Sequence, residues 1–298
     1  GCTSFAAWDT NTKDGELLLG RNFDFYAGDE FSEEKIVAFV NPDAGHKFMM
    51  YTWGGMIGVV SGMNEKGLTI TINAGKSKIP LIAKTPISLV AREILQYAEK
   101  TKEAIEIAQK REVFVSESIM IGSASENKAI LIEVSPDNFG VFEVPNSDQL
   151  ICSNHFQSEV FEDDKRNSKT ILESHSQYRY DRMKELLATN NSLNPEKAAA
   201  ILRNKEGLEG VDLGLGNEKA INQLLAHHGI IFKPKERKVW VSSNPYHMSP
   251  FVACDLLNTY EIFETGANYI SVMNPSKTIL VDEFIYSAKF RDYEEFRS

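Results

Sequence analysis

Apolar and polar residues alternate at strand spacing along much of the first half of the chain. In one such segment, Leu68, Ile70 and Ile72 alternate with Thr69 and Thr71, so that one face of the strand is apolar. The run at 58–63 and the polar loop at 64–67 make this segment the second arm of a β-hairpin. Runs of the same type predict further strands at 33–40, 47–53, 118–123, 128–134, 139–144 and 150–153.

Apolar residues at helical spacing interrupt and follow these strands. Thr85 can cap one helix, which reaches 98, and Thr101 opens a second. Further helices are predicted at 168–188, from 194 onward and near 218–226. The last strands are expected at 229–232, 238–242, 269–272 and 278–281, ahead of a charged tail.

The N-terminal stretch brings a cysteine next to two charged residues. Two strand-like runs, at 2–8 and 16–25, are joined by a polar segment that contains Asp14 and Gly15. This pattern predicts a β-hairpin whose first strand starts at Cys2. The hairpin would place the Cys2 thiol beside the end of the second strand, where Arg21 and Asp24 stand three residues apart.

A cysteine at the start of a chain carries a nucleophile and a base in one residue. A free α-amino group has a pKa of roughly 7.7–8.0 and can accept the thiol proton. A neighbouring Arg21 would favour the thiolate, and Asp24 could accept hydrogen bonds from the ammonium or hold the arginine. The alternative is an ordinary ion pair between Arg21 and Asp24, with Cys2 a buried thiol. Spacing alone leaves both interpretations open.

Two sequence runs resemble a known superfamily. Cys-Thr-Ser at 2–4, followed by Gly-Arg-Asn-Phe-Asp-Phe at 20–25, is similar to the motif of the N-terminal-nucleophile (Ntn) cysteine hydrolases. This superfamily includes the choloylglycine hydrolases and penicillin V acylases, the acid ceramidase-like amidases and the isopenicillin N acyltransferases. The resemblance implies an α+β fold, a four-layer αββα sandwich of two antiparallel sheets, and cleavage of a linear, non-peptide amide.

The resemblance brings further residues into the expected site. Asn73, beyond Asn-Glu-Lys-Gly-Leu at 64–68, matches the position at which the bile salt hydrolase group places an oxyanion-hole asparagine. Asn154, in Cys-Ser-Asn-His at 152–155, matches an asparagine that the family places against the nucleophile, and Arg179 matches a further active-site arginine. The implied catalytic residues are Cys2, Arg21, Asp24, Asn73, Asn154 and Arg179.

The residues themselves leave simpler interpretations open. An asparagine past a strand end, such as Asn73, is often a turn residue. Arg179 on a helix can be solvated or paired with Asp181. His155 would be the base of a Cys–His enzyme, although a terminal amine leaves it no necessary task. Cys152 stands among apolar residues and is expected in the core.

Gly1 precedes Cys2 and blocks its α-amino group, and three explanations compete. Gly1 is a remnant of an expression tag, or it ends a leader that the enzyme removes itself, as relatives in the isopenicillin N acyltransferase group do. In the third explanation Gly1 and Cys2 end a bacterial lipoprotein signal, and the cysteine receives a lipid. The cellular location is therefore open, and a removed leader would favour an extracytoplasmic one, periplasmic or lipid-anchored.

Composition excludes several other classes of function. The 298 residues, 42% hydrophobic and 25% charged, can bury a sizeable core, and we expect one domain over 1–298. The net charge of -10 and a pI near 5.2 argue against a nucleic-acid partner. No apolar run reaches the ~18 residues of a membrane span. Three widely spaced cysteines and the adjacent His227 and His228 predict no disulfide framework and no zinc site, so we expect no metal and no cofactor.

The sequence thus predicts a hydrolase of linear C–N amide bonds. Its substrate would be a small-molecule N-acyl amide with a hydrophobic acyl group, of the bile acid conjugate, N-acylethanolamine, ceramide or acyl penicillin type. An acyltransferase of the isopenicillin N type is the alternative, because the sequence does not show whether water is excluded from a thioester. A non-catalytic, lipid-anchored protein that binds an acylated ligand is the alternative of another class. The oligomeric state stays open, with a homo-oligomer among the options.

Overall fold

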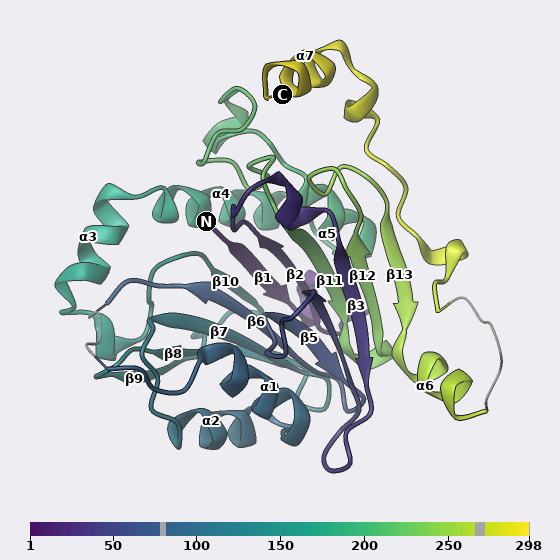
Figure 1. Ribbon diagram of the computed structural model, residues 1–298. Helices are drawn as coiled ribbons and strands as arrows, with labels where there is room; N and C mark the ends of the chain where they lie inside the picture. The colour runs from purple at the N-terminus through teal and green to yellow at the C-terminus, as the bar shows by residue number, and fades with distance from the viewer. Residues whose placement is uncertain (78–81, 266–271, 298) are drawn as a thin grey trace.

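The computed structural model describes residues 1–77, 82–265 and 272–297 and contains two antiparallel β-sheets packed face to face (Figure 1). The six-stranded sheet has the spatial order β10 (Gln149–Cys152), β1 (Thr3–Ala7), β2 (Leu18–Phe23), β11 (His228–Lys233), β12 (Lys238–Ser242) and β13 (Phe251–Asp255). The seven-stranded sheet has the order β3 (Lys35–Val40), β4 (Phe48–Trp53), β5 (Ser61–Asn64), β6 (Leu68–Ala74), β7 (Glu117–Ser123), β8 (Lys128–Val134) and β9 (Phe139–Phe142).

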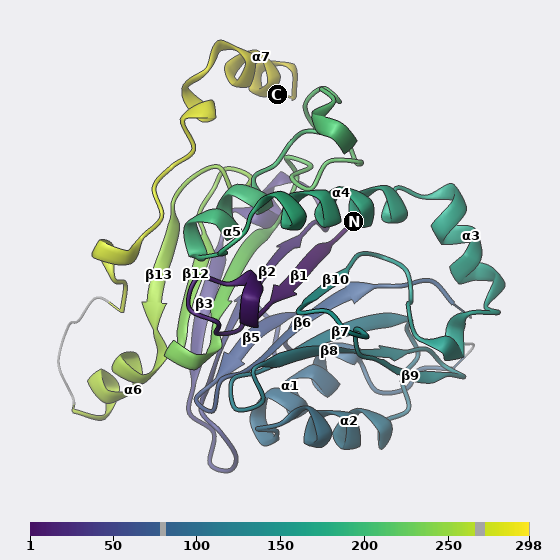
Figure 2. The ribbon, with the colours of Figure 1, turned by 180° about the vertical axis from the view of Figure 1, so that it is seen from behind.

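Helices cover the outer face of each sheet. Helices α1 (Ile87–Tyr97) and α2 (Thr101–Gln109) pack on the seven-stranded sheet, and α4 (Ser176–Thr189) and α5 (Pro195–Leu202) pack on the six-stranded one (Figures 1 and 2). The remaining helices, α3 (Lys165–Glu173), α6 (Leu256–Glu264) and α7 (Ala288–Arg297), lie at the periphery. The expected four-layer αββα sandwich is therefore confirmed. Within the described ranges, every helix is too short or too polar to span a bilayer.

The strand pattern of β6 shows how the sequence builds these layers. Leu68, Ile70 and Ile72 join the apolar cluster that α1 and α2 cover. Thr69 and Thr71 point to the opposite face and are also buried, because that face packs against the second sheet. The two faces of β6 are therefore both buried: the apolar residues face the helices, and the threonines face the second sheet.

The N-terminal hairpin is confirmed. Strands β1 and β2 pair antiparallel, with Thr3 opposite Asn22 and Ser4 opposite Arg21. Strand β10 pairs with the other edge of β1, and β11 pairs with the other edge of β2. The hairpin thus lies inside the six-stranded sheet, and the N-terminus lies next to α4 in both views (Figures 1 and 2).

The single helix predicted at 168–188 is wrong, because the chain forms α3 and α4 with a break between them. At the break, the hydroxyl of Ser174 donates to the carbonyl of Thr170 at 2.6 Å and accepts from the backbone N–H of Ser176 at 3.1 Å. This hydroxyl ends one helix and starts the next, which is the usual competition between serine side chains and helical hydrogen bonds.

The helix predicted near 218–226 is also wrong. These residues, all of which the structure describes, form turns and bends. The carboxamide oxygen of Asn222 accepts from the backbone N–H of Leu224 at 3.1 Å, and Leu224 has a φ of 50°, which no α-helix allows. The segment therefore runs in an irregular path toward the N-terminus of the chain, where Gln223 makes its contacts.

The C-terminal segment was predicted least well. At 278–281 only Ile279 pairs, in an isolated bridge to Phe251, and no strand forms within these described residues. The strand expected at 269–272 lies outside the described residues except for its last position. Strand β13 and helices α6 and α7 were not predicted.

Candidate active site

Cys2 lies at the start of β1, beside the guanidinium of Arg21 on β2. Arg21 Nη2 is 3.8 Å from Cys2 Sγ, and the exposed fractions are only 1% for Arg21 and 5% for Cys2. Burial lowers the pKa of Arg21, while Cys2 and Asp24 act to raise it, and a guanidinium in a protein remains protonated. A fixed positive charge therefore stands where a thiolate would form.

A chain of buried hydrogen bonds holds the Arg21 guanidinium. Nη1 donates to Ser61 Oγ at 2.8 Å, and Nη2 donates to the carbonyl of Ile72. Because a guanidinium only donates, Ser61 accepts from it and turns its own hydrogen to His228 Nε2, 2.9 Å away. His228 therefore carries its hydrogen on Nδ1, which donates to His227 Nδ1 at 2.7 Å.

Both histidines of this chain are neutral. Burial lowers the pKa of His227 to about 3, and the positive charges of Lys35 and Arg21 act in the same direction. Burial also lowers the pKa of His228 far below its usual value. The direction of the hydrogen bonds is thus constant around neutral pH, which gives Arg21 one orientation toward the thiol.

Gln223 connects the start of the chain with Asp24. The Gly1 ammonium donates to Gln223 Oε1 at 3.0 Å, and Gln223 Nε2 donates to the Gly1 carbonyl at 2.7 Å and to Asp24 Oδ2 at 3.3 Å. Burial raises the pKa of Asp24 to about 6, against the opposing charges of the N-terminal ammonium, Arg179 and Arg21. The other carboxylate oxygen, Oδ1, is buried without a hydrogen-bond partner among the described residues, so Asp24 retains a free acceptor.

Arg179 on α4 and Asn154 beyond β10 contact each other near the N-terminus, and we call this pair the polar wall. Arg179 donates to Asn154 Oδ1 at 2.6 Å, to Thr3 Oγ1 at 3.2 Å and to the carbonyl of Glu218 at 2.8 Å. Asn154 Nδ2 donates to the carbonyl of Ala74 at 2.8 Å. An amide nitrogen has two hydrogens, and the described residues accept only this one from Asn154. Asn154 thus has a free N–H whose orientation Arg179 sets.

Gly1 fits tightly against this wall. A Cβ atom at position 1 would clash with Asn154 Oδ1 and lie 2.6 Å from Arg179 Nη2. No larger residue can occupy this position unless the wall moves. In the described chain, Gly1 therefore fills the space next to the side chains of Asn154 and Arg179.

Asn73 has a different environment from Asn154. Its Nδ2 donates to Ser4 Oγ at 2.9 Å and lies 3.2 Å from the carbonyl oxygens of both Cys152 and Ser153. These three acceptors use both amide hydrogens, so the side chain of Asn73 links β6 to β1 and β10. Asn73 thus contacts Ser4, two residues after Cys2, and its amide hydrogens are already engaged.

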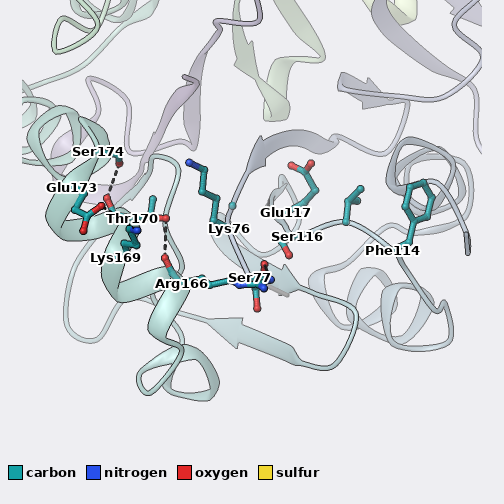
Figure 3. Close-up of a pocket in the computed structure, with 12 residues that line it drawn as sticks. Lys76, Ser77, Phe114, Ser116, Glu117, Arg166, Lys169, Thr170, Glu173 and Ser174 are labelled. Atoms are coloured by element: carbon teal, nitrogen blue, oxygen red, sulfur yellow. Dashed lines mark hydrogen bonds and ion pairs between the residues drawn. The ribbon is translucent and has the colours of Figure 1, made fainter. Parts of the chain in front are cut away.

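Two adjoining cavities lead outward from Gly1, which lines the inner one. The inner cavity, about 390 Å³, is lined by Gly1, Asn154 and Arg179, and the outer one, about 690 Å³, extends to Phe114. Figure 3 shows the outer cavity between α3 on one side and Phe114, Ser116 and Glu117 on the other. The two cavities share the residues Gly75, Lys76, Thr170, Glu173 and Ser174. They therefore form one continuous space, which we call the Gly1 groove.

Charged side chains line the outer part of the Gly1 groove. Lys76 and Glu117 project into it from the ends of the β6 and β7 strands (Figure 3). Burial raises the pKa of Glu117 to about 7, although the charge of Arg21 acts to lower it. Glu117 therefore changes its charge near neutral pH, within the space open to a ligand.

The alternative candidates, His155, Cys152 and Asp181, make other contacts. His155 Nδ1 is 2.8 Å from Ser176 Oγ, and burial lowers the pKa of His155 to about 4, so the imidazole is neutral. Cys152 is fully buried in the core, and burial raises the pKa of its thiol. Asp181 accepts a hydrogen bond from Gln177 at 2.9 Å. The ion pair considered for Arg179 and Asp181 is replaced by the contacts of Arg179 at the N-terminus.

Sequence reasoning missed three residues of the site. Ser61 and His228 hold Arg21, and Gln223 holds Gly1. From the sequence, the adjacent His227 and His228 were considered only as zinc ligands, and this role was rejected. Gln223 lay in a segment predicted to be helical. No local pattern marks these residues. The pairing of β11 with β2 brings His228 and the segment of Gln223 to the site, and Ser61 comes from β5 of the other sheet.

A protein-family model and one known protein sequence match parts of this chain. The model of the family described as acyl-coenzyme A:6-aminopenicillanic acid acyl-transferase matches residues 10–245. An uncharacterized protein of Archaeoglobus fulgidus is 31% identical over 144 residues, which cover 47% of this chain and 24% of that protein. The chain thus matches only about a quarter of the length of this relative.

Three solved structures have a similar fold at low sequence identity. The N-acylethanolamine-hydrolyzing acid amidase ortholog of Caenorhabditis elegans has a TM-score of 0.58 and 16% identity, over 78% of this chain and 93% of that one. A variant of the conjugated bile acid hydrolase of Clostridium perfringens has a TM-score of 0.55 and 15% identity, over 87% and 93%. Penicillin V acylase of Agrobacterium tumefaciens has a TM-score of 0.53 and 15% identity, over 82% and 84%. Identities this low bear on the fold alone.

Proposed function

Because the chain belongs to the acyl-coenzyme A:6-aminopenicillanic acid acyl-transferase family and has an Ntn-hydrolase fold, we propose that it hydrolyses linear N-acyl amides with Cys2 as its nucleophile. The observation that carries this proposal is the contact between the Arg21 guanidinium and the Cys2 thiol. Both groups are buried. Gly1, the residue before Cys2, lines the inner part of the Gly1 groove, and removal of Gly1 would open this part toward the sulfur.

In this proposal, Gly1 is removed before Cys2 acts. Hydrolysis of the Gly1–Cys2 peptide bond frees the α-amine of Cys2 and empties the space that Gly1 fills beside Asn154 and Arg179. The free Oδ1 of Asp24 supports this step, because it offers an acceptor to the new ammonium. The Arg21 guanidinium then supplies a positive charge beside the Cys2 thiol, and the Asp24 carboxylate accepts from the Cys2 ammonium.

The first half of the reaction forms a thioester. The α-amine of Cys2 takes the thiol proton, and the thiolate attacks the carbonyl carbon of the substrate amide. Negative charge develops on the carbonyl oxygen, and the free N–H of Asn154 donates to it. The ammonium of Cys2 then gives its proton to the departing nitrogen, the C–N bond breaks, and the amine leaves.

The second half releases the acid. Water gives a proton to the α-amine of Cys2 and attacks the thioester carbonyl, the C–S bond breaks, and the carboxylic acid leaves. Arg179 keeps Asn154 in place through both halves, since it holds Asn154 Oδ1. Asn73 supports the wall through its links to β1 and β10.

The Gly1 groove is the proposed acyl site. Phe114 and Val115 give its outer part apolar surface, and Lys76, Arg166 and Glu117 add charge at its sides. Such a groove suits an apolar acyl chain with a polar substituent. The acyl groups that relatives accept, named in the sequence analysis, define the classes to be tested.

Acyl transfer is the second candidate, and the family description favours it. The thioester would be the same, but an amine instead of water would attack it. The two reactions differ only in the acceptor, so they are separated by the products formed when an acceptor amine competes with water.

The proposal is tested with the chain expressed together with its native upstream residues. Intact mass is expected to show a product that starts at an unmodified Cys2, and this product should release acid from N-acyl amides of graded chain length. Addition of 6-aminopenicillanic acid tests for transfer by formation of the acylated amine. A mass that shows lipid on the Cys2 sulfur would replace the proposal with the lipid-anchored binding protein.

Ser61 offers a sharper test of the Arg21 contact. In the Ser61→Ala variant, one buried N–H of Arg21 loses its acceptor while the contact with Ile72 remains, so kcat/KM should fall about tenfold. Thr71→Val is the matched control, because Thr71 pairs with Ser61 across β5 and β6 and its buried hydroxyl has no partner in the described chain. Equal activity of the two variants would show that Ser61 does not position Arg21.

A further inference from the structure

A separate cavity of about 390 Å³ opens between the two sheets at their β3 and β13 edges. Figure 1 shows β3 crossing in front of β12 and β13, which belong to the other sheet. The walls include Val37, Tyr51, Val241 and Val252, together with Lys35. None of its lining residues belongs to the Gly1 groove. We call this space the β3–β13 cavity.

Lys35 brings an amine into these apolar surroundings. Its Nζ is buried and has no hydrogen-bond partner among the described residues. Burial lowers the pKa of Lys35 to about 8, so the amine is still mostly protonated at neutral pH. Glu33 also lines the cavity, but it is exposed. A buried ammonium without a partner is costly, and a bound anion would remove that cost.

Two imidazoles, His227 and His247, lie behind the residues that line the β3–β13 cavity. Trp53 pairs with Lys35 across β3 and β4, and its ring packs edge-on against His227 with 5.1 Å between ring centres. Ser242 lines the cavity, and its Oγ is 3.1 Å from His247 Nδ1. Burial lowers the pKa of both imidazoles, and the charge of Lys35 acts in the same direction.

Among the described residues, each imidazole uses only one of its two ring nitrogens in a hydrogen bond. His227 Nδ1 accepts from His228, so the hydrogen of the neutral His227 is on Nε2. Ser242 Oγ accepts from the backbone N–H of Gly229 at 2.7 Å and forms a hydrogen bond with His247 Nδ1 at 3.1 Å, so the Nε2 atom of His247 faces away from Ser242. Both Nε2 atoms are buried without partners in the described ranges.

We propose that the β3–β13 cavity binds a small carboxylate with an apolar chain, with the carboxylate at the Lys35 amine and the chain against the valine-lined walls. Lys35 Nζ, the polar atom of this lining that is buried without a partner in the described chain, is a donor with a positive charge. An ionised carboxylate only accepts, whereas water brings hydrogens that need acceptors of their own. The volume is within the range of about 300–1,000 Å³ typical of small-molecule sites.

The test measures octanoate binding by calorimetry. The protein is the Cys2→Ala variant, so that turnover and binding at the thiol do not contribute. We expect a saturable octanoate site that Lys35→Met weakens roughly 10- to 100-fold, because a charge-assisted hydrogen bond is lost; octanoate held in the Gly1 groove would not respond to this variant. Acetate should bind more weakly than octanoate, because it has almost no apolar chain to bury.

Two further variants separate this cavity from the Gly1 groove. Val252→Phe fills the apolar part of the β3–β13 cavity and should abolish binding even if Lys35→Met folds poorly. Lys76→Met removes an amine from the Gly1 groove and should leave octanoate binding unchanged. The proposal is overturned if octanoate does not bind, if Lys35→Met binds it equally well, or if Lys76→Met abolishes binding.

Discussion

Replacement of Cys2 by alanine is expected to abolish amide hydrolysis in the chain that begins at Cys2. The loss should be roughly 10⁴- to 10⁶-fold in kcat, the range found when the nucleophile or its partners are removed from a hydrolase. No other described side chain stands in the same relation to Arg21, whose Nη2 contacts the Cys2 sulfur. The measurement is the initial rate of acid release from an N-acyl amide, with thermal unfolding recorded on the same sample.

Cys152→Ala is the control for this experiment. Cys152 is fully buried, and burial raises the pKa of its thiol, so it remains a neutral core side chain. Its replacement should lower the melting temperature through a small core cavity while kcat stays within about twofold of wild type. If Cys2→Ala kept its activity and Cys152→Ala lost it, the nucleophile would have been assigned to the wrong cysteine.

The N-terminal hairpin and the individual strands could be predicted from the sequence because they depend on short stretches of chain, whereas the sandwich was implied by the family resemblance. Alternation within β6 and the two runs around Asp14 and Gly15 can be recognised without knowledge of distant residues. The contact of Cys2 with Arg21 follows from the register of that single hairpin. The resemblance of these runs to the Ntn hydrolases then supplied the second sheet and the outer helices, which the solved structures confirm.

The supports of the site could not be predicted in the same way. Gln223 and His228 are far from Cys2 in sequence, and the pairing of β11 with β2 brings their segment to the N-terminus. In segment 218–226 the apolar spacing favoured a helix, but Asn222 and Leu224 adopt a turn in which a side-chain hydrogen bond replaces a helical one. Tertiary contacts outweighed local propensity here, as they do where a chain surrounds a functional group.

The two asparagines illustrate the same limit within the site. From the sequence, Asn73 was the first oxyanion candidate, and Asn154 was the second, as an oxyanion donor or a positioning residue. In the structure, the amide hydrogens of Asn73 are used by Ser4 and two backbone carbonyls, whereas Asn154 has one free. The number of free donor hydrogens, which only the fold reveals, therefore assigns them different proposed roles: Asn154 as the oxyanion donor and Asn73 as a brace.

Asn154→Asp should lower kcat and kcat/KM together by roughly 10²- to 10³-fold, because it removes the N–H proposed to meet the oxyanion. Aspartate keeps the oxygen that accepts from Arg179 Nη2, so the wall and the fold should persist. The added negative charge also opposes the developing oxyanion, which acts in the same direction. Steady-state kinetics over a range of amide concentrations, with melting temperatures for each protein, measure this effect.

Asn73→Ala is the comparison that makes the result specific. It removes the links from β6 to β1 and β10, so the melting temperature should fall by several degrees while kcat falls less than about tenfold. Asn154→Asp should show the reverse, a near-normal melting temperature with a large loss of kcat. If Asn73→Ala instead lost kcat at an unchanged melting temperature, the oxyanion donor would be Asn73, and its side chain would have to leave Ser4 when substrate binds.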